Sequence, residues 1–376
     1  MDFSLEPKYL EIQARARSTA ASIAHIAAEA DDWSTVHPEI LAALRASELS
    51  RLMVPAEFGG AFEQVDPLAI CVVREALMAT CSHLDSLFAL QGIGSFAITK
   101  AGSAEQRAAW LPRIASVDVL AALALTEPDA GSDLKSVTTE VVATPEGLRL
   151  NGVKSYISNG GAAGFYEVFA REGEAYSMLL VPADAPGVTV TPTPELIAPH
   201  VLGDVRFDNV LLPPESRLGK AGEGLSLVLA TLAVFRVSVA GASIGLAQAA
   251  LEEATRHART RVQFGRPLSR LGPVAQLLAD SWTDIEMARL LTYRAAQMAQ
   301  RDPGATIEHS SMAKLAASEA AGRVVDRCVQ VMGRFGLVRN SRIERLYRQA
   351  RPMRIYEGAS EVLRLGIARE LTRIVD

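Results

Sequence analysis

The sequence predicts a mainly α-helical protein with a central antiparallel β domain. Apolar residues recur at helical spacing from residue 1 to about 117 and again from about 223 to 376. Between these segments, short runs rich in β-branched and aromatic residues are separated by turns. The apolar fraction is 49% and the aromatic fraction 6%, which favours long helices packed through small aliphatic side chains. A chain of 376 residues has room for several domains, and we expect them at 1–117, 118–222 and 223–376.

The N-terminal segment is expected to be helical. Pro38 suits a first helical position, and Ile40, Leu41 and Leu44 follow at helical spacing. Two strongly apolar helical stretches follow, at Cys71–Leu77 and at Leu84–Lys100, and Gly102 ends the second.

The middle segment is expected to form the β domain. Pro145-Glu146-Gly147 resembles a hairpin turn, and prolines cluster from Pro182 to Pro214. The predicted strands are Ala121–Thr126, Thr138–Ala143, Leu148–Ser158, Tyr166–Arg171, Tyr176–Val181, Val188–Thr191 and Val205–Val210.

The C-terminal segment begins with a long apolar stretch. Between Glu223 and Gln248 the only charged residue is Arg236, and the stretch is long enough to span a bilayer. A mid-membrane arginine would be costly, and Gly241 and Gly245 favour close helix packing, so we expect a buried helix and no membrane. Further helices are expected from Pro273 to the Asp302-Pro303-Gly304 stop and from about Thr306 to Met332, before Gly333.

Composition excludes several functional classes. The net charge is −5 without a basic run, so no nucleic-acid footprint is visible. Cys71, Cys81 and Cys328 are too scattered for a disulfide framework or a cysteine-type zinc site, and no metal is expected. The first residues lack the basic and apolar regions of a signal peptide, so a reduced, cytoplasmic location is expected.

Two segments follow predicted strands with polar groups suited to a cofactor. Leu125–Asp133 (LTEPDAGSD) offers two hydroxyls and several backbone N–H groups, or it is simply a polar turn. In Tyr156–Gly161 (YISNGG), strand alternation puts Tyr156 and Ser158 on one face, where a ring could stack and a hydroxyl could bond a heterocycle.

Two more segments lie at helix ends. Arg261–Gly265 (RVQFG) pairs a cation with an aromatic ring, which suits a pyrophosphate or, alternatively, a helix dipole. In Tyr356-Glu357-Gly358, a carboxylate precedes an apolar helix beside a glycine that permits positive φ. Glu357 is therefore either a carboxylate that points into a pocket or a first-turn residue that complements the helix dipole.

Taken together, these segments resemble the acyl-CoA dehydrogenase family of flavoenzymes over essentially the whole chain. The motifs are TEPDAGSD, YISNGG, RVQFG, QVMG and IYEG, in that order. The resemblance implies an N-terminal helical domain, a β-barrel or sandwich middle domain and a C-terminal four-helix bundle, with FAD in the cleft between them.

The resemblance also implies site residues. The flavin end of FAD would be bound by Leu123, Leu125, Thr126, Ser132, Tyr156 and Ser158. A neighbouring subunit would bind the pyrophosphate and adenine end through Arg261, Phe264, Gln330, Gly333 and Arg334, which makes a homo-oligomer, usually a tetramer, part of the expectation. The acyl thioester would contact Ser132, Arg236, Tyr356 and Gly358. Electron-transferring flavoprotein would be the electron acceptor.

By the same resemblance, Glu357 is the catalytic base. A thioester α-proton is weakly acidic, so the base must be close, dry and raised in pKa. Some relatives carry the base one residue before the arginine that matches Arg236, but here that residue is Phe235. A packing or ion-pair role for Arg236 is as consistent with the pattern as contact with the ligand.

Departures from the family pattern concern the carrier end of the substrate. Relatives commonly have an acidic residue where this chain has Ala233, a threonine at Ala359 and a glycine at Arg334. The helix expected at the pocket floor is apolar (Leu87, Phe88, Ala89 and Leu90), which favours an apolar acyl chain over a dicarboxylyl thioester. An acyl-carrier-protein substrate remains an alternative. Oxygen-using relatives usually lack the glutamate, and the acidic balance disfavours a nucleic-acid-binding relative.

Overall fold

The computed structural model describes residues 4–301 and 307–375. Their packing divides these residues into two compact units. We call them unit 1 (within Met1–Asp31, Pro67–Asp85 and Ala233–Asp376) and unit 2 (Asp32–Asp66 and Ser86–Leu232). The division into domains at 1–117, 118–222 and 223–376 stays a prediction, because the units follow packing rather than chain order.

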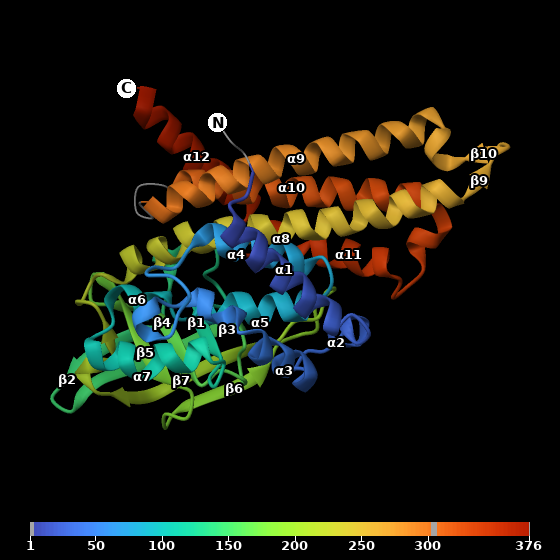
Figure 1. Cartoon of the computed structure of the whole chain (residues 1–376). Helices are drawn as coiled ribbons and strands as arrows, with labels where there is room; N and C mark the ends of the chain where they lie inside the picture. The colour runs from blue at the N-terminus through green and yellow to red at the C-terminus, as the bar shows by residue number, and fades with distance from the viewer. Residues whose placement is uncertain (1–3, 302–306, 376) are drawn as a thin grey trace. The chain divides into compact units, whose positions relative to one another are not determined.

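Unit 1 is helical. Long helices α8, α9 and α10 run lengthwise beside one another in the yellow-to-orange part of Figure 1, and α12 extends toward the C-terminus. The predicted stop at Asp302-Pro303-Gly304 and the start at Thr306 lie outside the described residues. The helices are α1 (Pro7–Ser22), α2 (Ala27–Ala30), α4 (Pro67–Met78), α8 (Gly224–Thr260, in unit 1 from Ala233), α9 (Gly272–Arg301), α10 (Ile307–Met332), α11 (Arg342–Ala350) and α12 (Ser360–Val375).

Helix α8 packs closely on α4 through glycines, as the sequence predicts. A Cβ atom at Gly241 would lie 2.6 Å from the Cys71 carbonyl oxygen, and one at Gly245 would lie 2.0 Å from that of Glu75. Among the described helices, α8 is the one long and apolar enough to cross a membrane, but 83% of its most apolar window is buried inside the protein. This is the pattern of a core helix, as expected.

Unit 2 contains shorter helices beside a sheet. Pro38 begins α3 as predicted, and Ser103 caps α7 by accepting the Gln106 N–H at 3.2 Å. The expectation of helix from Leu84 to Lys100 is wrong at Gly94, where a Cβ atom would lie 2.6 Å from the Ala122 nitrogen of strand β1. The close approach of that strand separates two helices. The helices of unit 2 are α3 (Pro38–Ser47), α5 (Ser82–Ile93, in unit 2 from Ser86), α6 (Phe96–Ala101) and α7 (Ala104–Ala115).

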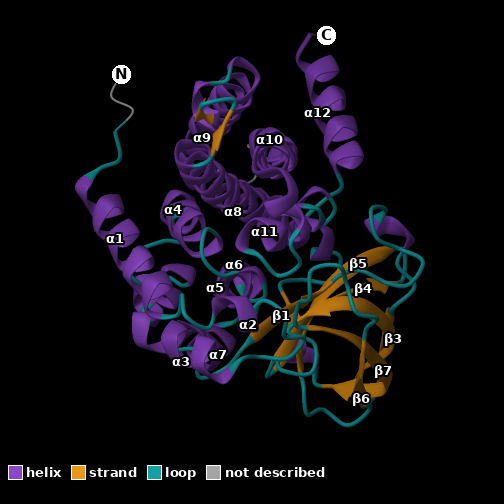
Figure 2. Cartoon of the chain, turned by 90° about the vertical axis from the view of Figure 1, so that its right-hand side faces the viewer, coloured by secondary structure: helices purple, strands orange, loops and turns teal. Residues whose placement is uncertain are grey.

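The sheet has the predicted strands but is mixed rather than wholly antiparallel. Its order is β6-β7-β3-β2-β4-β5-β8, and β1 pairs with β4. Most pairs are antiparallel, but β4 runs parallel to both β1 and β2, because the intervening hairpin reverses the chain before β4. Figure 2 shows the curved sheet in orange. The strands are β1 (Ala121–Ala124), β2 (Glu140–Thr144), β3 (Gly147–Ser158), β4 (Phe165–Glu172), β5 (Ala175–Pro182), β6 (Val188–Pro192), β7 (Leu202–Leu212) and β8 (Arg217–Leu218).

The sheet folds around an apolar core. Tyr166 of β4 and Phe207 of β7 are buried, and their rings meet edge to face with centroids 6.4 Å apart. The Pro145-Glu146 turn joins β2 to β3, with Thr144 paired to Gly147 as predicted. The mainly α fold with a central β domain is confirmed.

Candidate active site

Glu357 lies in a turn of unit 1, between the short helix η7 (Pro352–Arg354) and α12. Helix α12 begins at Ser360, so Glu357 precedes the helix instead of occupying its first turn. Its φ is +56°, and that of Gly358 is +104°. The left-handed backbone turns the glutamate away from the helix path. This geometry excludes the alternative of a first-turn glutamate.

The carboxyl group of Glu357 is held in a low-dielectric, cationic environment. Its Oε2 is buried and has no hydrogen-bond partner among the described residues. Burial raises the pKa of Glu357, and the positive charges of Arg236, Arg74 and Lys314 oppose that rise. An unbonded, partly desolvated carboxyl group with a raised pKa has the properties of a general base.

Arg236 is bonded to the backbone of this turn. Its Nε donates to the Glu357 carbonyl oxygen at 2.8 Å, and its Nη1 to Ser311 Oγ at 3.3 Å. Of the two roles that the sequence left open, the structure shows the packing role. Contact with a ligand stays a prediction.

Arg74 is committed to a buried ion pair. It donates to the two carboxylate oxygens of Asp85 at 2.9 and 2.7 Å and to Ser238 Oγ at 3.0 Å. The ion pair with Asp85 holds Arg74 in place, and the positive charge of Arg74 still acts to lower the pKa of Glu357.

The sequence analysis missed Lys314 of α10. Its side chain is fully buried, and its Nζ donates to the Gly358 carbonyl oxygen at 2.8 Å. The neighbouring positions Ala313, Ala317 and Ala321 on the same helix are also buried. A lysine among small buried residues of a helix is the signal that could have revealed it.

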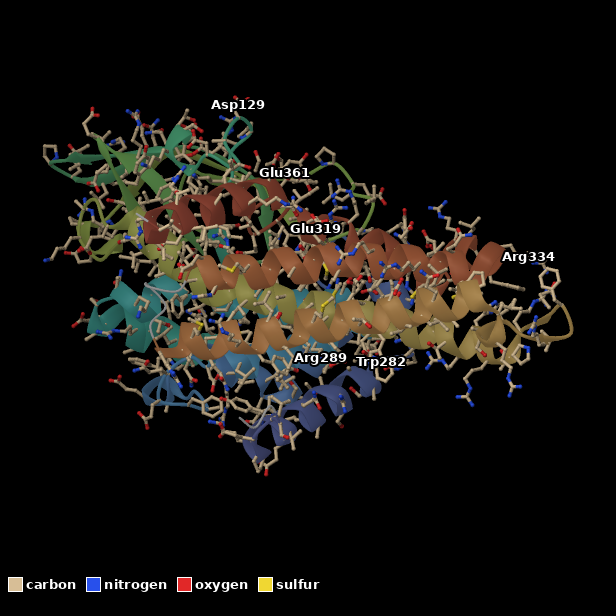
Figure 3. All side chains as sticks on the ribbon, turned by 90° about the horizontal axis from the view of Figure 1, so that it is seen from above. Asp129, Trp282, Arg289, Glu319, Arg334 and Glu361 are labelled. Atoms are coloured by element: carbon tan, nitrogen blue, oxygen red, sulfur yellow. The ribbon has the colours of Figure 1, made fainter. Side chains whose placement is uncertain are left out.

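Ion pairs and hydrogen bonds fix the start of α12 to α10. Glu319 accepts from Ser360 Oγ at 2.6 Å and pairs with Arg354 at 3.2 Å and Arg364 at 3.6 Å. Figure 3 labels Glu319 on α10, Glu361 on α12, and Arg334 beyond the C-terminal end of α10. Tyr356, which precedes Glu357, is 40% exposed, and its predicted contact with a substrate stays a prediction.

In unit 2 the two predicted cofactor segments meet. The Ser155 N–H donates to the Thr126 carbonyl oxygen at 2.8 Å, and Asn159 Nδ2 donates to the Ala121 carbonyl oxygen at 3.0 Å. The segment after β1 is thereby joined to β3, and the residue after β3 to the start of β1. Leu123, Leu125 and Thr126 are partly exposed there, and Ser132 is exposed in the loop beyond.

A buried ion pair that the sequence analysis missed supports this junction. Lys154 Nζ lies 2.9 Å from both Glu127 Oε1 and the Leu125 carbonyl oxygen. Burial would raise the pKa of Glu127, but hydrogen bonds from Lys154, Thr138 and Thr139 lower it to about 2. The pair is therefore charged at neutral pH and fixes the path of the loop around Thr126.

A β-bulge presents Tyr156. Between the pairs Lys154–Val205 and Ile157–Gly203, two residues of β3 face Asp204 alone. Tyr156 has φ +55°, donates its N–H to Asp204 Oδ1 at 3.0 Å, and leaves its side chain 48% exposed. The core residue Ile157 points the opposite way, so Tyr156 and Ser158 share the outer side, as strand alternation predicts.

His200 is a further residue that the sequence analysis did not identify. Its Nε2 lies 3.1 Å from Ser158 Oγ and 3.2 Å from Ser86 Oγ. The imidazole therefore orients the hydroxyl that is expected to face the flavin. Only tertiary structure joins these positions, because they are far apart in sequence.

A cationic group lies at the far end of unit 1. The guanidinium carbons of Arg261 and Arg334 lie 5.8 and 5.0 Å from the centre of the Phe335 ring. Phe264, at the tip of the β9–β10 hairpin (Val262–Gln263 and Arg266–Pro267), has φ +51° and is 90% exposed. Gln330 and Gly333, which are close to Arg334 in sequence, are also exposed. The predicted adenylate-binding residues are thus largely accessible.

These groups fit a flavin dinucleotide by their chemistry. An exposed aromatic ring, a hydroxyl and the backbone around Gly160-Gly161 suit a planar ring system, and the arginines suit a pyrophosphate. A Cβ atom at Gly160 would lie 2.6 Å from the Gly203 nitrogen, so this position requires glycine. In the described part of the chain, no cluster of three or more His, Cys, Asp or Glu side chains is suited to a metal ion.

Comparison with known proteins covers almost the entire chain. Models of the acyl-CoA dehydrogenase N-terminal, middle and C-terminal domains match residues 7–118, 122–210 and 222–372. A cyclohexane-1-carbonyl-CoA dehydrogenase from Geobacter metallireducens is 34% identical over 93% of both chains.

Two solved structures extend the likeness. Butyryl-CoA dehydrogenase from Megasphaera elsdenii superposes with a TM-score of 0.94 at 28% identity, over 99% of this chain and 100% of that one. A glutaryl-CoA dehydrogenase from Mycobacterium smegmatis in complex with FADH2 has a TM-score of 0.91 at 26% identity, over 98% and 95%. With its motifs, its domains and its fold in agreement, the chain belongs to the acyl-CoA dehydrogenase family, oxidoreductases that act on CH–CH bonds.

Proposed function

We propose that the protein converts an acyl-CoA to its trans-2-enoyl-CoA with FAD as the cofactor and Glu357 as the base. The observation that supports this most directly is the buried, unbonded Oε2 of Glu357 beside three cationic side chains. A base of this kind removes a proton from a carbon atom only when it is desolvated and held in position.

In this proposal, Glu357 removes the α-proton of the thioester and keeps it on its carboxyl group. When bound, FAD would supply the acceptor for the β-hydride and the polarisation of the thioester carbonyl. Arg236 holds the Glu357 backbone through its 2.8 Å hydrogen bond, so the carboxyl group stays in one orientation. Ser158, oriented by His200, provides a hydroxyl for the edge of the flavin ring, and Tyr156 provides the stacking surface.

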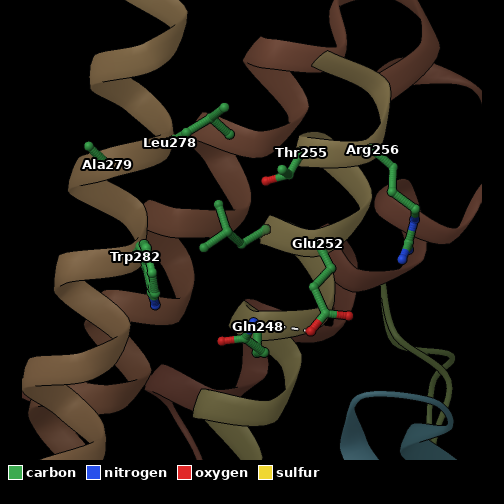
Figure 4. A pocket seen from close by; sticks show the side chains of 8 residues that line it. Gln248, Glu252, Thr255, Arg256, Leu278, Ala279 and Trp282 are labelled. Carbon is green, nitrogen blue, oxygen red and sulfur yellow. Dashed lines mark hydrogen bonds between the residues drawn. The ribbon is translucent and has the colours of Figure 1, made fainter. Parts of the chain in front are cut away.

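We also propose a homo-oligomer, a tetramer by family expectation, in which the cofactor is shared between subunits. Unit 1 carries an exposed apolar surface suited to a second copy. A shallow pocket between α8 and α9, lined by Leu251, Leu278 and Trp282, is open to solvent (Figure 4). On α9, Trp282, Met287 and Leu290 are 63%, 60% and 50% exposed. Exposed apolar side chains in this density are typical of a subunit contact.

Arg261→Ala is expected to lower FAD occupancy without unfolding the protein. Arg261 is exposed at the end of α8, and its guanidinium is expected to bind the pyrophosphate of a cofactor held mainly by another subunit. The ratio of flavin to protein absorbance after purification measures occupancy. Arg259→Ala, two residues earlier and also exposed, is the matched control. A wild-type monomer that retains FAD at full occupancy would contradict the shared site.

The acyl group is proposed to be apolar. In α5, Leu87, Phe88, Ala89 and Leu90 are buried and carry no charge that could pair with a second carboxylate. Of the relatives described above, two are named for apolar acyl groups (cyclohexane-1-carbonyl-CoA and butyryl-CoA) and one for a dicarboxylyl group (glutaryl-CoA), so the proposal rests on the lining of α5.

A carrier-protein thioester is the second candidate substrate. The observation that favours it is Ala233, which is fully buried and offers no acidic side chain where relatives commonly have one. Electron-transferring flavoprotein is the proposed electron acceptor and the cytoplasm the proposed compartment.

Anaerobic bleaching of the flavin spectrum across a panel of acyl-CoA and acyl-carrier thioesters tests the proposal. Flavin released by heat should first be identified as FAD by chromatography. Straight-chain or cyclic acyl-CoA compounds are expected to bleach the flavin, and glutaryl-CoA is not. Recovery of FMN, or no bleaching by any thioester, would refute the proposed function.

A further inference from the structure

The turn that carries Glu357 has an unfavourable backbone conformation. Two successive residues, Glu357 and Gly358, have φ of +56° and +104°. Left-handed backbone at a non-glycine residue is unfavourable and persists only where the surroundings impose it. The contacts that impose it therefore determine where the base points.

Two cations from different helices bind the two consecutive carbonyl groups of this turn. Arg236 of α8 donates to the Glu357 carbonyl oxygen, and Lys314 of α10 donates to the Gly358 carbonyl oxygen, each at 2.8 Å. A Cβ atom at residue 358 would lie 3.1 Å from Arg236 Nη2 and 3.0 Å from Leu363 Cδ2. The cations thus bind the backbone on the C-terminal side of the Glu357 Cα atom and leave its carboxyl group free.

Lys314 is unusual because it is a buried cation without an ion-pair partner among the described residues. Its side chain is fully buried, yet in residues 4–301 and 307–375 no carboxylate lies within 4 Å of its Nζ. Glu319, on the same helix, is instead bound by Arg354, Arg364 and Ser360. Buried lysines are rarely left unpaired, since desolvation of the charge is costly.

We propose that Lys314 is a positioning residue for Glu357: it fixes the turn through the Gly358 carbonyl group and holds a buried positive charge close to the base. This inference rests on the proposed function. Arg236 alone would hold one carbonyl group of the turn. Arg236 and Lys314 together hold the carbonyl groups of both left-handed residues.

The charged groups around Lys314 define its expected pH behaviour. They are Glu357 in the turn, Arg236 on α8, Glu319 on its own helix and Glu361 on α12. Burial lowers the pKa of Lys314 to about 8, although the negative charge of Glu357 opposes this. Lys314 therefore loses its charge near pH 8, and the proton affinity of Glu357 should rise as it does.

The test compares Lys314→Gln, Lys314→Met and Lys314→Arg in the full-length, FAD-loaded protein. Glutamine retains a donor for the Gly358 carbonyl group without the charge, methionine removes both, and arginine retains both. Lys8→Met is the matched control, because Lys8 is an exposed lysine of unit 1 that pairs with Glu6 at 3.4 Å. Infrared difference spectra without substrate follow protonation of Glu357, whose carboxyl band is identified by its loss in Glu357→Gln.

In Lys314→Gln and Lys314→Met, the midpoint of the Glu357 band should move to higher pH, as expected when a nearby opposite charge is removed. Single-turnover flavin reduction should show the same shift of its acid limb and lose the change near pH 8. Lys314→Met should in addition lower the rate at every pH, because the turn is released. Lys8→Met should titrate like the wild type. Lys314→Arg should keep the wild-type midpoint of the Glu357 band but lose the change near pH 8, because a guanidinium stays charged there.

An unchanged midpoint in a folded Lys314→Gln protein would overturn the proposal, whatever the rates. If Lys314→Met does not fold, Lys314→Gln and Lys314→Arg still decide the question of charge. A wild-type enzyme that no thioester reduces would refute the proposed function, but the infrared titration would still test the coupling of Lys314 to Glu357.

Discussion

Replacing Glu357 by glutamine is expected to slow flavin reduction by an acyl thioester by a factor of about 10²–10⁴. Glutamine keeps the size and hydrogen-bonding shape of the side chain but cannot accept the α-proton. Stopped-flow measurement on a substrate found by the bleaching panel gives this rate. Glu357→Asp should be intermediate, because the shorter side chain withdraws the carboxyl group. A Glu357→Gln variant that reduces flavin at nearly the wild-type rate would place the base elsewhere.

The stability of Glu357→Gln separates a base from a structural residue. Burial raises the pKa of Glu357 in the folded protein, so folded protein binds more protons than unfolded protein above pH 4.5. Wild-type stability contributed by this group therefore falls as pH rises from 4.5 through the raised pKa. Glutamine does not titrate, so the stability of the variant does not fall in this way as pH rises. Its thermal midpoint at pH 8 should therefore equal or exceed that of the wild type. A lower midpoint at pH 8 would indicate a structural role.

Replacing Lys154 by methionine is expected to destabilise unit 2 by about 3–5 kcal/mol, because the Glu127 carboxylate would remain buried without its cation. Both side chains are almost completely buried, and the 2.9 Å pair also holds the Leu125 carbonyl oxygen. The loop around Thr126 should loosen, and FAD occupancy should fall with it. Chemical denaturation followed by intrinsic fluorescence, together with the flavin-to-protein ratio, measures both effects.

The pH dependence of this loss distinguishes an unpaired charge from a packing defect. In the wild type the pKa of Glu127 is lowered to about 2, so its stabilisation is complete above pH 4.5. Without Lys154, burial raises that pKa, and stability should fall as pH rises above 4.5. The variant should therefore be closer to the wild type at pH 5 than at pH 8. The double variant Lys154→Met/Glu127→Gln should regain most of the stability, and equal losses in the single and double variants would refute the ion-pair explanation.

Local patterns predict most of the secondary structure and the site motifs, because they depend on neighbours in sequence. Period-two alternation locates β3 and the shared side of Tyr156 and Ser158, and helical spacing locates α3, α4 and α9. The break at Gly94 and the parallel pairing of β4 are not predictable in this way. The break at Gly94 depends on the close approach of β1, and the parallel pairing depends on β1 lying beside β4. In each case the two segments are distant in sequence.

The sequence by itself determined the family, and its contiguous motifs predict Glu357 as the base and the residue types expected around a flavin. Only tertiary structure showed which side chains hold the turn that carries Glu357. Arg236 and Lys314 reach the Glu357-Gly358 turn from 121 and 44 residues away, and each binds a backbone carbonyl group that has no side-chain signature. Likewise, in unit 2 Lys154 contacts Glu127, and His200 contacts Ser158, although the members of each pair are distant in sequence. The proton affinity of a carboxyl group depends on its burial and on the charges that the fold brings close to it. A linear sequence pattern records neither.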